Sequence, residues 1–283
     1  MTIKDLHQYS LSSLISHYPE IEAKNLTYMA LSNIFDFSRY QIHLNLDKTV
    51  DENQYAKIKN IVDELKQYKP IQYIFKETEF YNCRIKVSED VLIPRPETEE
   101  LVDWIIQDQD NDEIEILDIG TGSGCIAISL AKNLRSSKVT AIDISPNAID
   151  VAKRNAKANN VEIIFLELDL FNIQDELQAI KFDIIVSNPP YVRECEKKMM
   201  QSNVLNWEPE ISLFVPDESP LLFYNIIIPF ATTSLKSKGL IYLEINENYP
   251  EEVKEVLMNH DFSSIEIRKD ISGKFRMIKA SKT

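Results

Sequence analysis

The chain has 283 residues, 44% of them hydrophobic and 27% charged, which is ordinary for a soluble globular protein of one or two domains. No apolar run reaches the roughly 18 residues that a membrane helix needs. The N-terminus lacks a basic segment followed by an apolar one, so we expect a cytoplasmic protein that does not associate with membranes. Three isolated cysteines and four scattered histidines argue against a disulfide framework and against a metal site.

Most of the net charge of −14 lies in the C-terminal three quarters of the chain. Residues 1–75 hold 8 basic and 9 acidic residues, a net charge of −1, while residues 76–283 hold 23 and 36, a net charge of −13. Such a surface repels the phosphates of nucleic acids, so we expect no direct nucleic-acid binding. Either of two explanations accounts for the negative charge: it favours a basic binding partner, or it only keeps the protein soluble.

The first 70 residues show the apolar spacing of helices. Leu6, Leu11, Leu14 and Ile15, for example, fall near one helical face. This pattern predicts a small helical bundle that ends at Pro70. The next apolar residues alternate, which predicts a β-hairpin between two domains. We therefore expect a helical domain, a hairpin linker and a larger domain, at 1–75, 76–93 and 94–283.

Strand-like and helix-like segments alternate in the larger domain. This rhythm predicts an α/β fold with a doubly wound, largely parallel sheet. The last two strand-like runs flank the turn sequence DISG, so we expect the sheet to finish with an antiparallel strand. The clearest expected strands are EIEILDIG (113–120), KVTAIDI (138–144), VEIIFLEL (161–168), FDIIVS (182–187) and GLIYLEI (239–245).

A glycine cluster follows the first of these strands. Three of the five glycines, Gly120, Gly122 and Gly124, lie in DIGTGSGC between a strand and a helix. Glycines there permit a tight turn and let the backbone approach a ligand. Asp143 ends the next strand, where an acid can bind ribose hydroxyls. The pattern predicts an adenosine-containing ligand and leaves NAD and S-adenosylmethionine open, although the dinucleotide fingerprint would need glycine in place of Cys125.

The sequence Asn188-Pro189-Pro190-Tyr191 directly follows the strand FDIIVS. In a doubly wound sheet this places it at the ligand-binding edge, beside the first strand. Prolines lack N–H groups, so the turn offers the Pro189 carbonyl and the Asn188 side-chain oxygen as acceptors. Two acceptors beside an aromatic ring suit a planar NH2 group, which they orient toward an electrophilic methyl group. The motif predicts methylation of an amide or exocyclic amine without a strong general base.

Together, these motifs resemble one family. The glycine loop, the acid at Asp143 and NPPY are typical of amino-nitrogen methyltransferases, and the segment VLIPRPETEELV resembles the release factor glutamine methyltransferases, the HemK/PrmC family. The resemblance covers nearly the whole chain. Its further segments are IQYIFKETEF (71–80), DIGTGSGCIAISLA (118–131), NWEPEISL (206–213) and DISGKFR (270–276).

The resemblance implies a class I methyltransferase that uses S-adenosylmethionine, releases S-adenosylhomocysteine, and methylates N5 of the glutamine in the Gly-Gly-Gln motif of peptide chain release factors. It also implies an N-terminal domain that docks the release factor; we expect a monomer. Asn188, Pro189, Pro190 and Tyr191 are implied to hold the substrate amide, with Asn188, Pro189 and Tyr191 catalytic, and Arg95, Pro96, Glu97 and Thr98 to border the same pocket. The implied cofactor-binding residues are Gly120, Thr121, Gly122, Ser123, Gly124, Asp143, Leu170 and Asn188.

Four other functions fit parts of the pattern. A ribosomal-protein glutamine methyltransferase shares the chemistry, but the run Glu97-Thr98-Glu99 disfavours it. A DNA adenine methyltransferase should carry a basic recognition region, which the acidic residues 76–283 do not show. A non-catalytic adaptor is disfavoured by the intact NPPY, and a dehydrogenase by the position of Gly124.

A few positions depart from the family pattern. Lys76 stands where glycine is usual, Glu218 lies in DESP, and Asn246 and Tyr249 replace residues of the usual EIG…Q segment. We expect these departures to affect substrate docking and to lie outside the cofactor and amide contacts.

The cysteines and tryptophans are expected to be structural. With no histidine nearby in the sequence, Cys125 and Cys195 are interpreted as small buried packing residues rather than nucleophiles. Trp104 and Trp207 are interpreted as packing residues rather than as cofactor-stacking ones.

Overall fold

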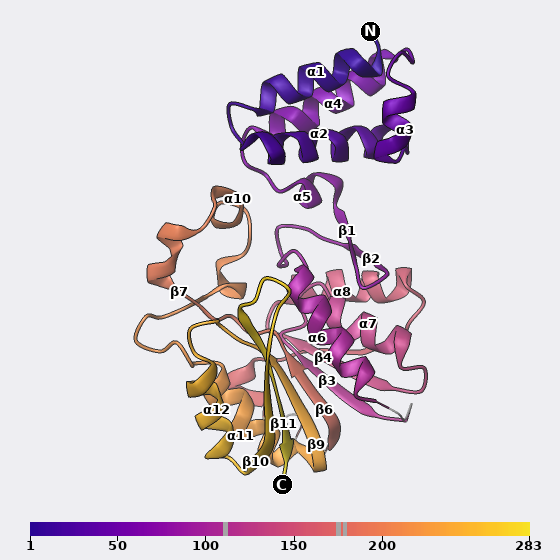
Figure 1. Ribbon diagram of the computed structural model, residues 1–283. Coiled ribbons are helices and arrows are strands. Elements are labelled where there is room, and N and C mark those ends of the chain that lie inside the picture. The colour runs from indigo at the N-terminus through magenta and orange to yellow at the C-terminus, as the bar shows by residue number, and fades with distance from the viewer. Residues whose placement is uncertain (110–112, 174–176, 178–179) are drawn as a thin grey trace. The chain divides into compact units, whose positions relative to one another are not determined.

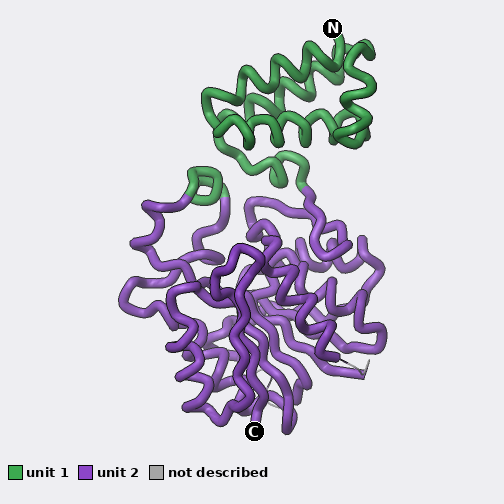
Figure 2. Tube along the Cα trace, viewed as in Figure 1, with its two compact units in different colours: residues 1–76, 201–207 green, residues 77–200, 208–283 purple. Residues whose placement is uncertain are grey.

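The computed structural model describes residues 1–109, 113–173, 177 and 180–283. The chain forms two compact units, which Figure 2 shows in different colours. The N-terminal unit contains residues 1–76 and 201–207, and the C-terminal unit contains residues 77–200 and 208–283. The segment 201–207 was expected in the larger domain, but it packs with the helices of the N-terminal unit: the indole N–H of Trp207 donates to the Gln67 carbonyl at 3.1 Å.

The N-terminal unit is a helical bundle (Figure 1). Three of its helices begin with a capping box, in which a side-chain oxygen before the helix and a side chain three residues later satisfy each other's backbone amides. The helices are α1 (Ile3–Leu14), α2 (Glu20–Phe35), α3 (Arg39–Leu44), α4 (Glu52–Leu65) and α5 (Ile71–Phe75).

Apolar side chains from these helices form one core. Leu6 and Leu14 of α1 pack there with Ile58 and Val62 of α4. Ile15, in contrast, is 49% exposed because α1 ends at Leu14 and the chain turns away. The apolar spacing therefore predicted the buried face of α1 correctly and was wrong only at its C-terminal end.

A hairpin opens the C-terminal unit. Strands β1 (Glu77–Phe80) and β2 (Cys83–Lys86) pair antiparallel, and the two-residue turn between them has positive φ angles of 44° and 57°. The hairpin is shorter than the 76–93 segment that was expected. The chain leaves the strand conformation because Ser88 starts a turn, in which the Val91 amide donates to the Ser88 carbonyl at 3.1 Å. Residues 87–95 are therefore available to border the site described below.

The C-terminal unit is built on a seven-stranded sheet with the order β10-β11-β9-β6-β3-β4-β5. The strands from β9 to β5 run parallel, whereas β11 is antiparallel to both of its neighbours. This confirms the doubly wound α/β fold with an antiparallel last strand. The strands are β3 (Glu115–Ile119), β4 (Lys138–Asp143), β5 (Ile164–Glu167), β6 (Phe182–Ser187), β9 (Leu235–Glu244), β10 (Phe262–Lys269) and β11 (Phe275–Lys282).

Helices cover both faces of this sheet, which is why β6 is buried along nearly its whole length (Figure 1). One face carries α6 (Pro96–Gln107), α7 (Cys125–Asn133) and α8 (Pro146–Ala158), and the other carries α11 (Tyr224–Ser234) and α12 (Pro250–Met258). None of the described helices is long and apolar enough to cross a membrane. Shorter elements are η1 (Leu170–Asn172), β7 (Val192–Arg193), η2 (Glu194–Met199), α10 (Ser202–Leu205), η3 (Glu210–Ser212) and β8 (Phe214–Val215).

Candidate active site

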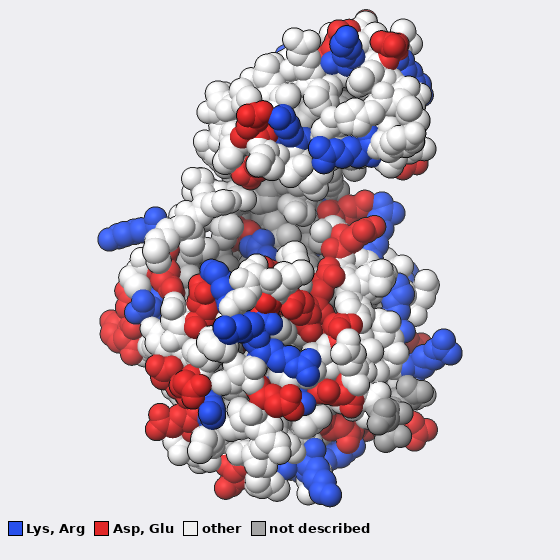
Figure 3. All heavy atoms as spheres, in the orientation of Figure 1, with Lys and Arg blue, Asp and Glu red and all other residues white. Residues whose placement is uncertain are grey.

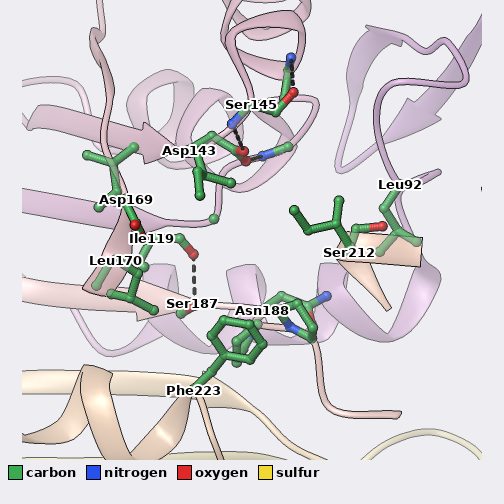
Figure 4. Close-up of a pocket in the computed structure, with 18 of the residues that line it drawn as sticks. Leu92, Ile119, Asp143, Ser145, Asp169, Leu170, Ser187, Asn188, Ser212 and Phe223 are labelled. Carbon is green, nitrogen blue, oxygen red and sulfur yellow. Dashed lines mark hydrogen bonds between the residues drawn. The ribbon is translucent and has the colours of Figure 1, made fainter. Parts of the chain in front are cut away.

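The carboxyl ends of the central strands meet at one edge of the sheet. Ile119 at the end of β3 is opposite Ser187 at the end of β6, so the glycine loop and the NPPY segment leave the sheet side by side. A cavity of about 240 Å³ lies at this edge (Figure 4). Its walls are mainly apolar and include Ile119, Ile142, Leu168, Leu170 and Phe223.

Glycine is required in the loop for two different reasons. Gly120, Gly122 and Gly124 all have positive φ angles, at 73°, 54° and 81°. Gly120 and Gly122 line the cavity, and a Cβ atom at either would meet no protein atom within 4 Å. A Cβ atom at Gly124 would instead lie 3.0 Å from the Cβ of Ala152. The first two glycines thus expose backbone to the cavity, and the third lets α7 and α8 pack closely.

Thr121, Ser123 and Gly124 are not among the residues that line the cavity. The Thr121 hydroxyl donates to Asp118 at 2.7 Å, and the Ser123 carbonyl accepts from the Asn155 side chain at 2.9 Å. These hydrogen bonds fix the conformation of the loop through residues that do not line the cavity. Of the five loop residues expected to bind a cofactor, the structure therefore brings Gly120 and Gly122 to the cavity wall.

Asp143 ends β4 and lines the same cavity. Its carboxylate accepts from the Gly122 amide at 2.8 Å and from the Ser145 amide at 2.9 Å. Burial raises the pKa of Asp143, and these backbone hydrogen bonds act against that rise. In Figure 4 this carboxylate lies across the cavity from Asn188 and Phe223. Asp143 therefore fixes the glycine loop to β4 and leaves an acceptor beside the open space.

A second, smaller cavity of about 50 Å³ adjoins the first. Asn188 and Pro189 line both cavities, whereas Tyr191 lines only the second and Pro190 only the first. Across the described residues, neither the Asn188 Oδ1 atom nor the Pro189 carbonyl accepts a hydrogen bond from the protein. Two unused acceptors thus stand where the cavities meet.

A buried carboxylate lies beneath these acceptors. Glu244, at the end of β9, is 1% exposed and lines the second cavity. It accepts from the Tyr191 hydroxyl at 2.8 Å and from the Thr98 hydroxyl at 2.6 Å, and Thr98 in turn accepts from the Asn188 side-chain NH2 group at 3.2 Å. Arg276 donates to the Tyr191 hydroxyl at 3.3 Å. The network joins α6, β9 and β11 to the NPPY segment.

Burial dominates the electrostatics of this network. It raises the pKa of Glu244, while the hydroxyls of Thr98 and Tyr191 and the charge of Arg276 oppose the rise. The pKa of Tyr191 is also raised well above its ordinary value, first by burial and then by the neighbouring carboxylate. Tyr191 is therefore a neutral hydrogen-bond donor at neutral pH.

Two family models match separate parts of the chain. Residues 6–75 match the family model of the PrmC N-terminal domain, and residues 98–206 match that of the Methyltransferase small domain. The chain is 44% identical to the release factor glutamine methyltransferase of Flavobacterium psychrophilum over 99% of both chains. It is 41% identical to that of Bacteroides thetaiotaomicron, over 97% of this chain and 98% of the relative.

The chain belongs to the release factor glutamine methyltransferase family. The resemblance drawn from its motifs is confirmed. The crystal structure of the ribosomal protein L11 methylase from Lactobacillus delbrueckii is similar to it with a TM-score of 0.52 and 20% identity, over 70% of this chain and 85% of that one. At that identity the likeness concerns the fold alone.

In this member of the release factor glutamine methyltransferase family, the segment before α6 is also part of the site. Arg95 lines the second cavity and forms an ion pair with the buried Glu208 at 2.6 Å, and Glu208 also accepts from the Ile93 amide at 3.2 Å. Pro96 and Glu97 line neither cavity. Thr98 is buried behind Asn188 and reaches the site only through hydrogen bonds.

Sequence reasoning missed Glu244, Arg276 and Glu208 as parts of the site. A signal existed for Glu244, because it is a charged residue at the carboxyl end of the apolar run GLIYLEI. That strand lies next to β6, so its last residue reaches the NPPY segment. The two other residues sit in segments already known from the resemblance, but nothing in the sequence pairs them with their partners.

Two departures from the family pattern have structural explanations. Lys76 caps α5 with a φ of 61°, a left-handed conformation that favours glycine. Asn246 donates to the Tyr191 carbonyl at 3.0 Å. Asn246 lines neither cavity, but through this hydrogen bond it fixes the backbone of Tyr191, which lines the second cavity.

The cysteines differ from each other. Cys125 is buried, and burial raises the pKa of its thiol to about 12, which agrees with a packing role. Cys195 is exposed, so the interpretation of it as a buried packing residue is wrong; it lies in the surface segment η2, where its amide donates to Asp217 at 2.9 Å. Trp104 and Trp207 line neither cavity. Among the described residues, no cluster of side chains could hold a metal ion.

Proposed function

We propose that this chain transfers a methyl group from S-adenosylmethionine to N5 of the glutamine in the Gly-Gly-Gln motif of peptide chain release factors, and so supports translation termination. One observation carries the proposal. Asn188 and Pro189 line both cavities, so the unused acceptors stand between a space suited to the cofactor and a space suited to an amide. Membership of the family names the amide as that of glutamine.

The larger cavity fits the cofactor. Gly120 and Gly122 offer exposed backbone to its methionine part, Asp143 offers an acceptor to the ribose hydroxyls, and Leu170 offers an apolar wall to the adenine ring. Thr121, Ser123 and Gly124 serve the cofactor by holding the loop. When bound, S-adenosylmethionine supplies an electrophilic methyl group on its sulfonium and leaves as S-adenosylhomocysteine.

The NPPY segment prepares the amide nitrogen. An amide is a poor nucleophile because its lone pair is delocalised into the carbonyl group. The Asn188 Oδ1 atom and the Pro189 carbonyl would accept the two N–H hydrogens and orient the nitrogen lone pair toward the first cavity. The same two oxygens stabilise the positive charge that develops on nitrogen. The nitrogen then loses a proton to solvent readily, so no strong base is needed.

The surface charge of the C-terminal unit bears on the kind of substrate. Figure 3 shows acidic and basic side chains intermixed on one face of the C-terminal unit, with no extended basic surface among the residues described there. A basic recognition surface of the kind that DNA methyltransferases need is therefore not seen on this face. The enzyme is proposed to act as a cytoplasmic monomer on a protein substrate, without direct nucleic-acid contacts.

The test compares three acceptors in one experiment. Tritiated S-adenosylmethionine is mixed with the protein and with purified release factor, ribosomal protein or DNA, and incorporated label is counted. Label should enter the release factor, and it should be lost when the target glutamine is replaced. Preferential labelling of ribosomal protein or DNA would overturn the proposal.

The N-terminal unit is proposed to dock the release factor. A protein that begins at Glu77 should bind S-adenosylmethionine within a few-fold of the full chain, since every residue that lines the larger cavity lies in the C-terminal unit. It should methylate release factor at least about 10-fold less efficiently, because docking energy from the N-terminal unit is lost. Circular dichroism melting checks that the shortened protein is folded. Unchanged turnover of release factor would leave the N-terminal unit without a docking role.

A further inference from the structure

The orientation of the Asn188 amide matters for the reaction proposed above. The nitrogen and oxygen ends of an asparagine side chain have nearly the same shape but opposite hydrogen-bonding character. With Oδ1 toward the substrate, the site accepts hydrogens from an NH2 group. With Nδ2 toward the substrate, it would donate hydrogens and would suit a carboxylate. Something must therefore select one orientation.

The buried network beneath Asn188 makes this selection. An ionised carboxylate can only accept, so the Thr98 hydroxyl must use its single hydrogen on Glu244, to which it donates at 2.6 Å. The Thr98 oxygen is then left with lone pairs only. It can pair with the NH2 end of Asn188, at 3.2 Å, and not with the oxygen end.

Glu244 is itself held in the accepting state. Its second oxygen accepts from the Tyr191 hydroxyl at 2.8 Å, and Arg276 donates to that hydroxyl at 3.3 Å. The hydroxyls of Thr98 and Tyr191 and the charge of Arg276 favour the ionised carboxylate and oppose burial, which raises its pKa. The hydroxyls of Thr98 and Tyr191 each have a single hydrogen, and each donates it to Glu244, so both hydroxyl oxygens act as acceptors toward their other partners.

We propose that Thr98 and Glu244 are positioning residues that fix the Asn188 side chain with its oxygen toward the substrate, and that they thereby select an amide over a carboxylate. The proposal rests on the proposed function, since it concerns the same site. It assigns neither residue a contact with the transferred methyl group. It explains why a buried acid stands behind a motif whose chemistry needs no base.

The central variant is Thr98→Val, which keeps the shape of the side chain and removes the hydroxyl. Single-turnover methylation of release factor, at saturating S-adenosylmethionine and release factor, should slow by about 10–100-fold, the usual effect of losing a partner that orients a functional group. Thr98→Ser keeps the hydroxyl and should stay within about 3-fold of the wild type. Cofactor affinity, measured by calorimetry, should change less than about 3-fold in both variants.

A matched control comes from the same unit. Thr232 donates its hydroxyl to the Ile228 and His260 carbonyls, and it lines neither cavity. Thr232→Val also removes hydrogen bonds of a threonine hydroxyl and should leave the methylation rate unchanged. Equal losses in Thr98→Val and Thr232→Val would attribute the effect to stability alone and would overturn the proposal.

The preference for a glutamine over a glutamate substrate is a property that a purely structural role of Thr98 would leave unchanged. Calorimetry with bound S-adenosylhomocysteine compares two release factors, one with the target glutamine and one with glutamate in its place. The wild type should prefer the glutamine form by at least about 10-fold, because two acceptor oxygens repel a carboxylate. Thr98→Val should reduce this preference several-fold. An unchanged preference, together with an unchanged rate, would overturn the proposal.

Glu244→Gln is a second variant that keeps size and shape. One carboxylate oxygen becomes an NH2 group, so the hydroxyls of Thr98 and Tyr191 can no longer both donate to this side chain. When Thr98 is the one that turns, its hydrogen points at Asn188 and favours the wrong orientation. We expect a reduced glutamine preference here too. A wild type that fails to label release factor would instead overturn the proposed function, which separates the two failures.

Discussion

The two cavities of the site are built in different ways. The larger one is formed mainly by the glycine loop, by the end of β4 and by apolar side chains, and its acceptor Asp143 is joined there to Gly122, which is 21 positions away. The smaller one depends on side chains from distant segments: Asn188 bonds to Thr98 over 90 positions, and Thr98 bonds to Glu244 over 146.

This difference follows from what each cavity has to recognise. A nucleoside cofactor is bound by exposed backbone, one acid and apolar walls, which a single βαβ segment can supply. An amide must be held with a defined hydrogen-bond polarity, which requires a chain of oriented side chains. Substitutions at the larger cavity should therefore weaken cofactor binding or the fold, whereas substitutions at the smaller one should slow the transfer.

The largest effect is expected for Asn188→Ala. Removal of one preorganised transition-state contact typically lowers turnover by about 10²–10³. Cofactor affinity should change much less, because Asn188 meets the larger cavity only at its edge. Single-turnover methylation at saturating cofactor and release factor measures the rate. Asn133→Ala, on α7 and outside both cavities, is the control, and a rate for Asn188→Ala within a few-fold of wild type would remove the distinction between the cavities.

Asp143→Ala should mainly weaken cofactor binding, in contrast to Asn188→Ala, which should mainly slow the transfer. Loss of hydrogen bonds to a charged acceptor should weaken S-adenosylmethionine binding by about 1.5–3 kcal/mol. The glycine loop loses its Gly122 contact as well. Calorimetry measures the affinity, with Asp183→Ala as the control, because Asp183 also accepts a backbone amide but lies outside both cavities. Equal cofactor affinities for Asp143→Ala and the wild type would contradict the assignment of Asp143.

A comparison of alanine substitutions at two glycines distinguishes the stability cost of backbone strain from the cost of crowded packing. Gly124 and Gly273 have nearly equal φ angles, 81° and 82°, but only Gly124 would place a Cβ atom against a neighbour, at 3.0 Å from Ala152. Both substitutions to alanine should cost about 1–2 kcal/mol for the left-handed backbone. Gly124→Ala should cost about 1–2 kcal/mol more through crowding of α7 against α8. Denaturant unfolding measures the two free energies, and equal values would show that α8 yields to the added methyl group.

The smallest effect concerns Asp118, behind the glycine loop. Burial raises its pKa to about 7, so between about pH 4 and pH 7 the folded protein holds a proton that the unfolded chain releases. This group's contribution to stability therefore falls as the pH rises through that window. Asp118→Asn lacks the contribution, so its free energy of unfolding relative to wild type should rise from pH 5 to pH 8 by about 1 kcal/mol or more. If the free energies of unfolding of the two proteins changed in parallel with pH, the raised pKa of Asp118 would be contradicted.

The sequence by itself determined the parts of the protein that depend on neighbours along the chain. The βαβ rhythm predicted the parallel sheet, and the terminal hairpin predicted the antiparallel β11. The glycine loop, Asp143 and NPPY predicted the family and its chemistry, because each motif carries its function in adjacent residues whose backbone conformation is locally set.

Only the tertiary structure decided which distant side chains complete the site. The order of strands places β9 beside β6, and this brings Glu244 close to the NPPY segment. Thr98 of α6 lies between the two and forms hydrogen bonds with both Glu244 and Asn188. The tertiary structure also showed that residues 201–207 pack with the N-terminal helices and that the hairpin ends at Lys86. Sequence patterns record the preferences of local backbone and the side that is buried, whereas the partner of a buried polar group depends on which segments the fold brings into contact.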